Sequence, residues 1–109
     1  MTFSTTVERR DNAAIVRLEG DLDIATELQA MADLERAMDS AGVLIADLRG
    51  LRFLDSTGVR VLLETDIRAR DQGLRFGVVR GEGMVARLLA VTRIGDRFPV
   101  VDDPDELIG

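Results

Sequence analysis

The sequence predicts an α/β domain with a central β-sheet and crossover helices, in the order ββαβαβαβ with a possible final helix. Three observations lead to this prediction. Short apolar runs alternate along the chain with longer stretches in which apolar residues recur every three or four positions. Turn signals separate these stretches, and the length of 109 residues fits one domain spanning residues 1–109. Strands that alternate with helices favour a sheet whose strands are joined by helices packed against it.

The N-terminal third contains two expected strands and one expected helix. Residues Thr2–Glu8 and Ala13–Glu19 are typical of short strands, and Asp11-Asn12 between them indicates a turn. A helix follows, with Asp23 as its expected N-cap and Gly42 as its stop. Apolar residues at spacings of three and four predict one buried stripe on this helix: Ile24, Leu28, Met31, Leu34, Met38 and Ala41.

The central segment combines a buried strand with the start of a second helix. Val43–Leu48 is a short, mostly apolar run, which favours a strand covered on both faces. After a short loop, the second helix is expected to begin near Ser56 and to continue to about Asp71. Arg60 and Glu64 lie four positions apart on one face of it, where opposite charges support each other weakly. Its expected buried stripe consists of Val59, Leu62, Leu63 and Ile67.

The C-terminal third predicts two further strands around a short helix. Leu74–Val79 is an expected strand, and Phe98–Val101 is an expected terminal strand. Pro104 can open a last helical turn over Asp105–Ile108. The helix between the strands is expected over Met84–Val91, with three inward residues: Val85, Leu88 and Leu89.

The composition excludes several classes of function. The chain has no Cys, which excludes disulfides, thiol catalysis and cysteine metal sites. It has no His, so the usual general base and the commonest metal ligand are absent. All 14 basic residues are Arg, which removes lysine chemistry. We therefore expect no catalytic residue, no metal site and no cofactor.

Charge and hydropathy restrict the partners. A net charge of −6 and only four aromatic residues, all Phe, make the chain a poor candidate for nucleic-acid binding. No apolar run approaches the ~20 residues of a membrane span, and the N-terminus lacks a secretion signal pattern. The expected location is the cytoplasm.

The segment Asp55-Ser56-Thr57-Gly58 is the most informative candidate site. It joins a strand to a helix, where a hydroxyl beside a carboxylate is presented to solvent and to any approaching partner. By spacing alone, Ser56 fits a helix N-cap, which contributes about 1 kcal/mol. Asp55 is either the cap or a group that orients the Ser hydroxyl. Gly58 either lets a partner approach the backbone closely or makes a tight packing contact.

The same segment carries a resemblance to a known family. Asp47-Leu48 followed by Phe53-Leu54-Asp55-Ser56-Thr57-Gly58-Val59 resembles the signature of the STAS domain, and most closely that of the single-domain bacterial anti-sigma factor antagonists. Weaker matches flank it at Gly20–Asp23, Arg75–Val79 and Leu89–Val100. The resemblance covers nearly the whole chain, and it implies a single STAS domain with a mixed sheet.

The resemblance implies a phosphorylation switch. In the antagonist family, the Ser directly after the Asp is phosphorylated by the cognate anti-sigma factor kinase, and Ser56 holds that position, with Thr57 as the alternative acceptor. A phosphate adds a charge of about −1.5 to −2 at neutral pH. A helix N-terminus tolerates an anion, so we expect the fold to remain and a docked partner to be released.

The resemblance also implies where a partner binds. In the family, the loop before the first helix lies beside the acceptor; for the two aspartates of this loop, turn and capping chemistry is the alternative. The chain has Gly58-Val59-Arg60 where Gly-Leu-Gly is commoner, which places a bulky cation near the expected contact face. The expected partner-binding residues are Asp21, Asp23, Thr26, Asp55, Ser56, Thr57, Gly58 and Arg60.

The implied function is that of a cytoplasmic anti-sigma factor antagonist. Unphosphorylated, it would bind an anti-sigma factor that is also a serine kinase and so free a sigma factor, and a serine phosphatase would reset it. The chain alone is expected to be a monomer. The alternative is a STAS interaction module in a lipid-transport or stress-signalling scaffold complex, without a phosphorylation cycle.

Two other classes of protein fit the sequence poorly. A receiver domain with Asp47 as its phosphoacceptor would need an acidic pair after an early strand and a late Lys, and the chain has neither. A serine hydrolase would need a base within reach of the Ser, and the motif lacks Gly-x-Ser-x-Gly.

Overall fold

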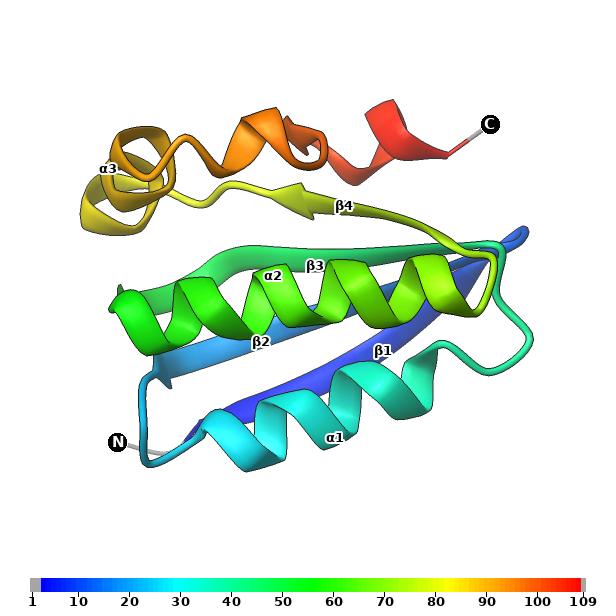
Figure 1. The fold of residues 1–109 in the computed structure, drawn as a ribbon, viewed down its shortest axis with the longest axis horizontal. Helices are drawn as coiled ribbons and strands as arrows, with labels where there is room; N and C mark the ends of the chain where they lie inside the picture. The colour runs from blue at the N-terminus through cyan, green and yellow to red at the C-terminus, as the bar shows by residue number, and fades with distance from the viewer. Residues whose placement is uncertain (1–2, 109) are drawn as a thin grey trace.

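The structure, a computed structural model, describes residues 3–108 and contains one five-stranded sheet in the order β1-β2-β3-β4-β5 (Figure 1). β1 (Ser4–Arg10) pairs antiparallel with β2 (Ala13–Leu22). The remaining pairs are parallel and join β2, β3 (Val43–Leu54), β4 (Arg75–Val79) and β5 (Val100–Val101) in turn. The sheet is therefore mixed, as the resemblance implies.

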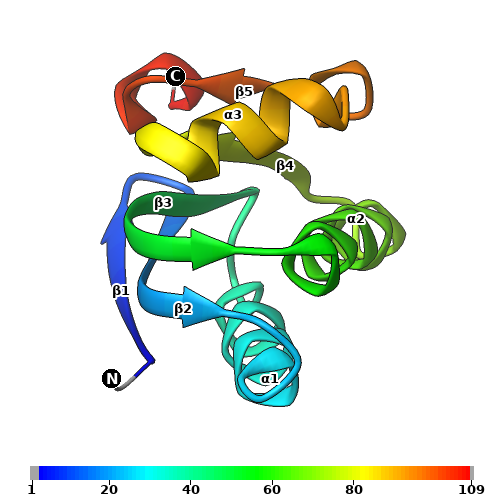
Figure 2. The same ribbon diagram turned by 90° about the vertical axis from the view of Figure 1, so that its left-hand side faces the viewer.

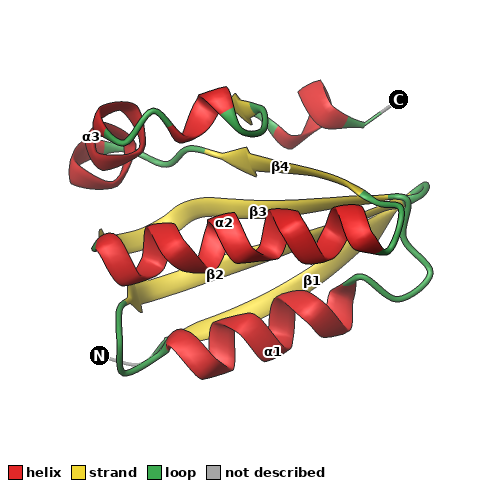
Figure 3. Cartoon of the chain, in the orientation of Figure 1, coloured by secondary structure: helices red, strands yellow, loops and turns green. Residues whose placement is uncertain are grey.

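Three α-helices and two 3-10 turns complete the described part of the chain: α1 (Glu27–Ala37), α2 (Ser56–Asp71), α3 (Gly83–Val91), η1 (Ile94–Asp96) and η2 (Pro104–Leu107). α1 and α2 lie side by side across one face of the sheet, with both of their N-termini at the same end (Figures 1 and 3). α3 and the C-terminal segment lie at the β4–β5 side (Figure 2). The predicted order of elements is confirmed, and the possible last helix is the turn η2.

The two faces of the sheet are covered unequally. On the helix side, alternate residues of the strands pack against α1, α2 and α3; those of the two central strands include Val16, Leu18, Leu44, Ala46 and Leu48. On the other side a smaller apolar cluster, centred on Ile15 and Ile45, is covered by Val101, Leu107 and Ile108. The second face is therefore closed only near the C-terminal segment.

β3 is longer than the sequence predicts. It continues beyond Leu48 to Leu54, through residues expected to form a loop. The pairing with β2 places Arg17 beside Asp47 and Glu19 beside Gly50, so β3 has one residue more than β2 in this interval. Such a bulge allows a strand to continue after an interruption of its apolar pattern.

The other boundaries differ by a few residues. The expected first strand began at Thr2, which lies outside the described residues, and β1 continues to Arg10. β2 continues to Leu22. β5 is shorter than expected, because Phe98 turns into the core and packs edge-on against Phe76, with 4.8 Å between the ring centroids.

The predicted buried stripe of the first helix is wrong at its start. α1 begins only at Glu27, so Ile24 lies in the preceding turn and is 77% exposed, and Leu28 is 84% exposed. The buried face is centred on Ala30, Leu34 and Ala37, with Met38 buried just beyond the helix. Small alanines form much of this contact, and a search for large apolar residues overlooks them.

The second helix shows the same effect. It spans the predicted residues, and Val59 and Leu62 are buried as expected, but Ile67 is 51% exposed. Val61, Thr65, Asp66 and Ala69 are buried instead. The stripe that faces the sheet therefore includes small and polar residues that periodicity alone does not identify.

α3 agrees with the prediction, since Val85 and Leu89 are buried and Leu88 is partly buried.

We expect Leu34→Ala to lower the free energy of unfolding by about 2–5 kcal/mol, because it leaves a cavity in the fully buried face of α1. The control is Leu28→Ala, the same change on the exposed side of the same helix, which should alter it by less than about 0.5 kcal/mol. Urea denaturation measures both. Equal losses would contradict the orientation of α1.

Candidate functional site

Asp55 is the N-cap of α2. β3 ends at Leu54, the backbone of Asp55 is extended, and the helix begins with Ser56. The Asp55 carboxylate oxygen Oδ1 accepts hydrogen bonds from the backbone N–H groups of Thr57 at 3.0 Å and Gly58 at 3.2 Å. Of the two roles open for Asp55, the structure therefore shows the capping role, and the N-cap interpretation of Ser56 is wrong.

Ser56 is left exposed by this arrangement. It is the first residue of the helix, and within residues 3–108 no hydrogen bond holds its hydroxyl group. Thr57 is half-buried, and so less open to another protein. The geometry favours Ser56 over Thr57 as the group that an approaching molecule can reach.

Gly58 fixes the helix against the sheet. It is buried, and a Cβ atom at this position would lie 3.0 Å from the carbonyl oxygen of Leu22 and would collide with the side chain of Leu54. The tight packing contact is therefore the role that the structure shows for Gly58. Because the first turn of α2 rests directly on the ends of β2 and β3, the position of Ser56 is well determined.

The loop between β2 and α1 closes on itself. The Asp23 carboxylate accepts a hydrogen bond from the Ala25 N–H at 3.0 Å. The Thr26 hydroxyl donates to the Asp21 carbonyl oxygen at 2.9 Å and accepts from the Asp23 N–H at 3.1 Å. Asp23 therefore stabilises a turn and is not the N-cap of α1, contrary to the prediction, because the helix begins four residues later at Glu27. Thr26 precedes the helix but makes no side-chain capping bond to it.

Ion pairs join this loop to β3 and α1 to α2. Asp21 pairs with Arg52 of β3 at 3.2 Å. Arg60 donates to the Glu27 carboxylate at 2.8 Å, and it lies 4.0 Å from Glu64. The hydrogen bond to Glu27 raises the pKa of Arg60 above its ordinary value. The predicted cation near the contact face is thus held between the two helices.

All the predicted site residues lie in two segments at one end of the sheet. Residues 21–26 comprise the last two residues of β2 and the loop after it, and residues 55–60 follow β3. The parallel pairing of Leu22 with Leu54 brings the two segments together (Figure 1). Sequence reasoning missed that Ile24 and Leu28, counted there as core residues, are exposed at this end. The signal was weak, since Ile24 precedes the helix and Leu28 lies in its first turn.

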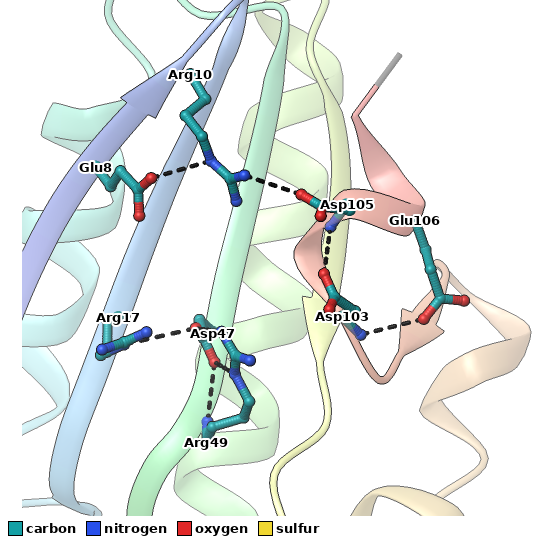
Figure 4. Close-up of polar contacts among 8 residues, drawn as sticks. All are labelled: Glu8, Arg10, Arg17, Asp47, Arg49, Asp103, Asp105 and Glu106. Carbon is teal, nitrogen blue, oxygen red and sulfur yellow. Dashed lines mark hydrogen bonds and ion pairs between the residues drawn. The ribbon is translucent and has the colours of Figure 1, made fainter.

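Asp47, the phosphoacceptor in the rejected receiver interpretation, is instead a buried residue that makes hydrogen bonds within the fold. Its carboxylate is fully buried and accepts hydrogen bonds from the Arg49 guanidinium at 2.7 and 3.0 Å, and Arg17 lies 3.6 Å away (Figure 4). The Arg49 backbone N–H also donates to it at 3.0 Å. Burial by itself raises the pKa of Asp47, but the bonds from Arg49 and the charges of Arg49 and Arg17 outweigh it and hold the pKa below its ordinary value.

Nothing in residues 3–108 resembles a metal centre, since no three His, Cys, Asp or Glu side chains gather in an arrangement that could hold an ion. None of the described helices is both long and apolar enough to cross a membrane.

Comparison with known protein families matches residues 4–107 to the STAS domain. The anti-sigma-F factor antagonist RsfB of Mycobacterium tuberculosis is 31% identical over 91 residues, which cover 79% of this chain and 70% of the relative. Among solved structures, an anti-sigma factor antagonist from Mycobacterium paratuberculosis superposes with a TM-score of 0.81 at 27% identity, covering 96% of this chain and 90% of that one. The Bacillus cell fate determinant SpoIIAA in its phosphorylated form has a TM-score of 0.69 at 18% identity, covering 95% and 96%, which shows likeness of fold alone.

We expect Asp47→Asn to lower the free energy of unfolding at neutral pH by about 1–3 kcal/mol, because charged hydrogen bonds are lost. Since the pKa of Asp47 is lowered in the folded state, its stabilisation is complete above the unfolded pKa of about 3.9 and declines as the pH falls through the folded pKa. The wild type should therefore lose more stability than the variant on acidification below about pH 4. Urea denaturation at several pH values measures this.

The matched control is Asp105→Asn, which removes the exposed partner of Arg10 (Figure 4). An exposed ion pair contributes about 0.2–1 kcal/mol to the free energy of unfolding, so this variant should lose no more than that. Parallel stability curves for wild type and Asp47→Asn across the acid range would show that the buried carboxylate does not stabilise the fold as its contacts indicate.

Proposed function

The chain belongs to the STAS domain family, and from that premise we propose that it is an anti-sigma factor antagonist switched by phosphorylation of Ser56. The observation that carries this proposal is the exposed Ser56 at the start of α2, with Asp55 satisfying the helix end in its place. A kinase needs a hydroxyl group that it can reach. Ser56 offers one without any helix-capping bond having to break.

The proposed partner is an anti-sigma factor that is also a serine kinase. Relatives of this chain are named as anti-sigma factor antagonists, which supports the role. In the unphosphorylated state the protein would bind this partner and so free a sigma factor, and a serine phosphatase would restore that state. The proposed contact surface consists of Asp21, Asp23, Thr26, Asp55, Ser56, Thr57, Gly58 and Arg60.

A phosphate on Ser56 would act on the interface and leave the fold intact. Asp55 already occupies the N–H groups of Thr57 and Gly58, so the phosphate would project outward from the first turn. Its charge of about −1.5 to −2 would stand beside the Asp55 carboxylate. A partner docked over this end would meet added bulk and negative charge that it must desolvate, which lowers affinity.

The protein is the substrate in this cycle. It has no His, Cys or Lys, so the usual nucleophiles and bases that could activate the Ser hydroxyl are missing from the whole chain. The phosphoryl group and the catalytic residues would come from the partner.

We expect incubation with ATP and the cognate kinase to add one phosphate to the wild type, and Ser56→Ala to abolish it. Thr57→Ala is the matched control, which should still accept the phosphate on Ser56. Ser56→Asp should weaken binding to the kinase on the order of tenfold or more, because it adds a charge at the contact. Intact mass with peptide mapping, and a binding titration, provide the two measurements.

The opposite outcome is equally informative. If a kinase that binds the protein adds no phosphate, and Ser56→Asp binds as tightly as the wild type, then the switch is absent. The chain would then be a constitutive STAS interaction module, such as a subunit of a lipid-transport or stress-signalling complex.

A further inference from the structure

Two ion pairs of the same type join α1 and α2. Arg60 pairs with Glu27 at the N-terminal ends of the helices, at 2.8 Å, and Arg68 pairs with Glu35 two turns further along, at 2.6 Å. All four side chains are at least partly exposed. The two pairs differ in one respect: only Arg60 lies within one helical turn of Ser56.

Arg60 lies four residues after Ser56 in α2. Residues four apart in an α-helix share a face, and helical side chains lean toward the N-terminus, so this spacing favours a guanidinium directed toward the turn that carries Ser56. Its electrostatics agree. After the hydrogen bond and charge of Glu27, the charges of Glu64 and Asp55 also raise the pKa of Arg60, whereas Asp55 makes no such contribution at Arg68. The guanidinium is therefore within reach of the start of α2.

A phosphate on Ser56 would compete with Glu27 for this guanidinium. The Glu27 carboxylate carries one negative charge and has two acceptor oxygens, while a phosphoserine carries about −1.5 to −2 and has three acceptor oxygens. The planar fork of Arg forms bidentate bonds with phosphate, and these are stronger than bonds between neutral groups. Asp55 and Glu64 add further negative charge around Arg60, so a phosphate at this end would be stabilised by a bond to this cation.

We propose that Arg60 is the residue that binds the phosphate on Ser56, and that it does so by leaving Glu27. The inference rests on the proposed function only for the origin of the phosphate. The exchange itself depends on the geometry of α1 and α2.

The exchange would loosen the first turn of α1. Glu27 is the first residue of that helix, and no side chain caps the helix start. Ile24 and Leu28, which are 77% and 84% exposed, lie on either side of Glu27. Phosphorylation would thus change the contact surface at two points, by adding charge at Ser56 and by releasing the turn that presents these apolar side chains. The Arg68–Glu35 pair would keep the helices together.

The experiment uses the full chain with phosphoserine incorporated at position 56 during synthesis, so that no kinase is needed. The pH titration of its phosphorus-31 NMR signal reports the second pKa of the phosphate. We expect Arg60→Gln to raise the second pKa of the phosphate, because the dianion loses its bond to the guanidinium. The acid dissociation constant of the phosphate should fall about threefold or more. Arg68→Gln, the matched control at the second ion pair, should leave that pKa unchanged.

Amide hydrogen exchange tests the second half of the proposal. Phosphorylation should accelerate exchange over residues 24–28 in the wild type, and it should do so less in Glu27→Gln, where the ion pair is already absent. Equal phosphate pKa values for Arg60→Gln and Arg68→Gln, or no change in exchange over residues 24–28 on phosphorylation, would overturn the proposal. A failure of the cognate kinase to modify Ser56 would overturn the proposed function instead, and would leave these measurements as they are.

Discussion

The candidate site depends on the buried carboxylate of Asp47. It lies where β3 gains one residue over β2, and it accepts the backbone N–H of Arg49 together with the Arg49 side chain. The extra residue of a bulge has no regular partner in the ladder, so a nearby acceptor stabilises the irregular point. β3 continues past it and gains a second residue over β2 between Leu51 and Phe53, so that Leu54 lies beside Leu22. The two segments that carry the site residues therefore meet at one end of the sheet.

At this end of the sheet, capping of α2 and packing against the strands are carried out by two different residues. Asp55 satisfies the backbone at the start of α2, and Gly58 allows that turn to rest on the strand ends. Ser56 is relieved of both tasks, since it neither caps nor packs, and its hydroxyl is open to solvent. A modification there can alter what the surface binds while the contacts that stabilise the fold persist. This separation would allow the proposed switch to leave the domain folded.

The same end holds an unusual combination of charge and apolar exposure. Ile24 and Leu28 are exposed to solvent near the Arg60–Glu27 pair, although their spacing is typical of a buried stripe. Exposed large apolar residues grouped together are typical of binding surfaces. The ion pair holds the turn that presents them, and its cation lies one helical turn from Ser56. In the proposed exchange, a charge on Ser56 would therefore affect the position of these apolar side chains through Arg60.

The order of the elements, the start of α2 and the exposure of Ser56 could be predicted from the amino-acid sequence, because apolar periodicity and the Asp55–Gly58 turn are local signals. The sequence also placed Val85 and Leu89 in the core. The continuation of β3 to Leu54 could not be predicted from the sequence, since it depends on pairing with β2 and on Asp47 at the bulge. The tertiary structure likewise decided the buried faces of α1 and α2, because the sheet selects which side of a helix it covers, and there small residues such as Ala30 and Ala69 permit close approach. The partnership of Arg60 with Glu27 joins residues 33 positions apart, a contact that no local pattern contains.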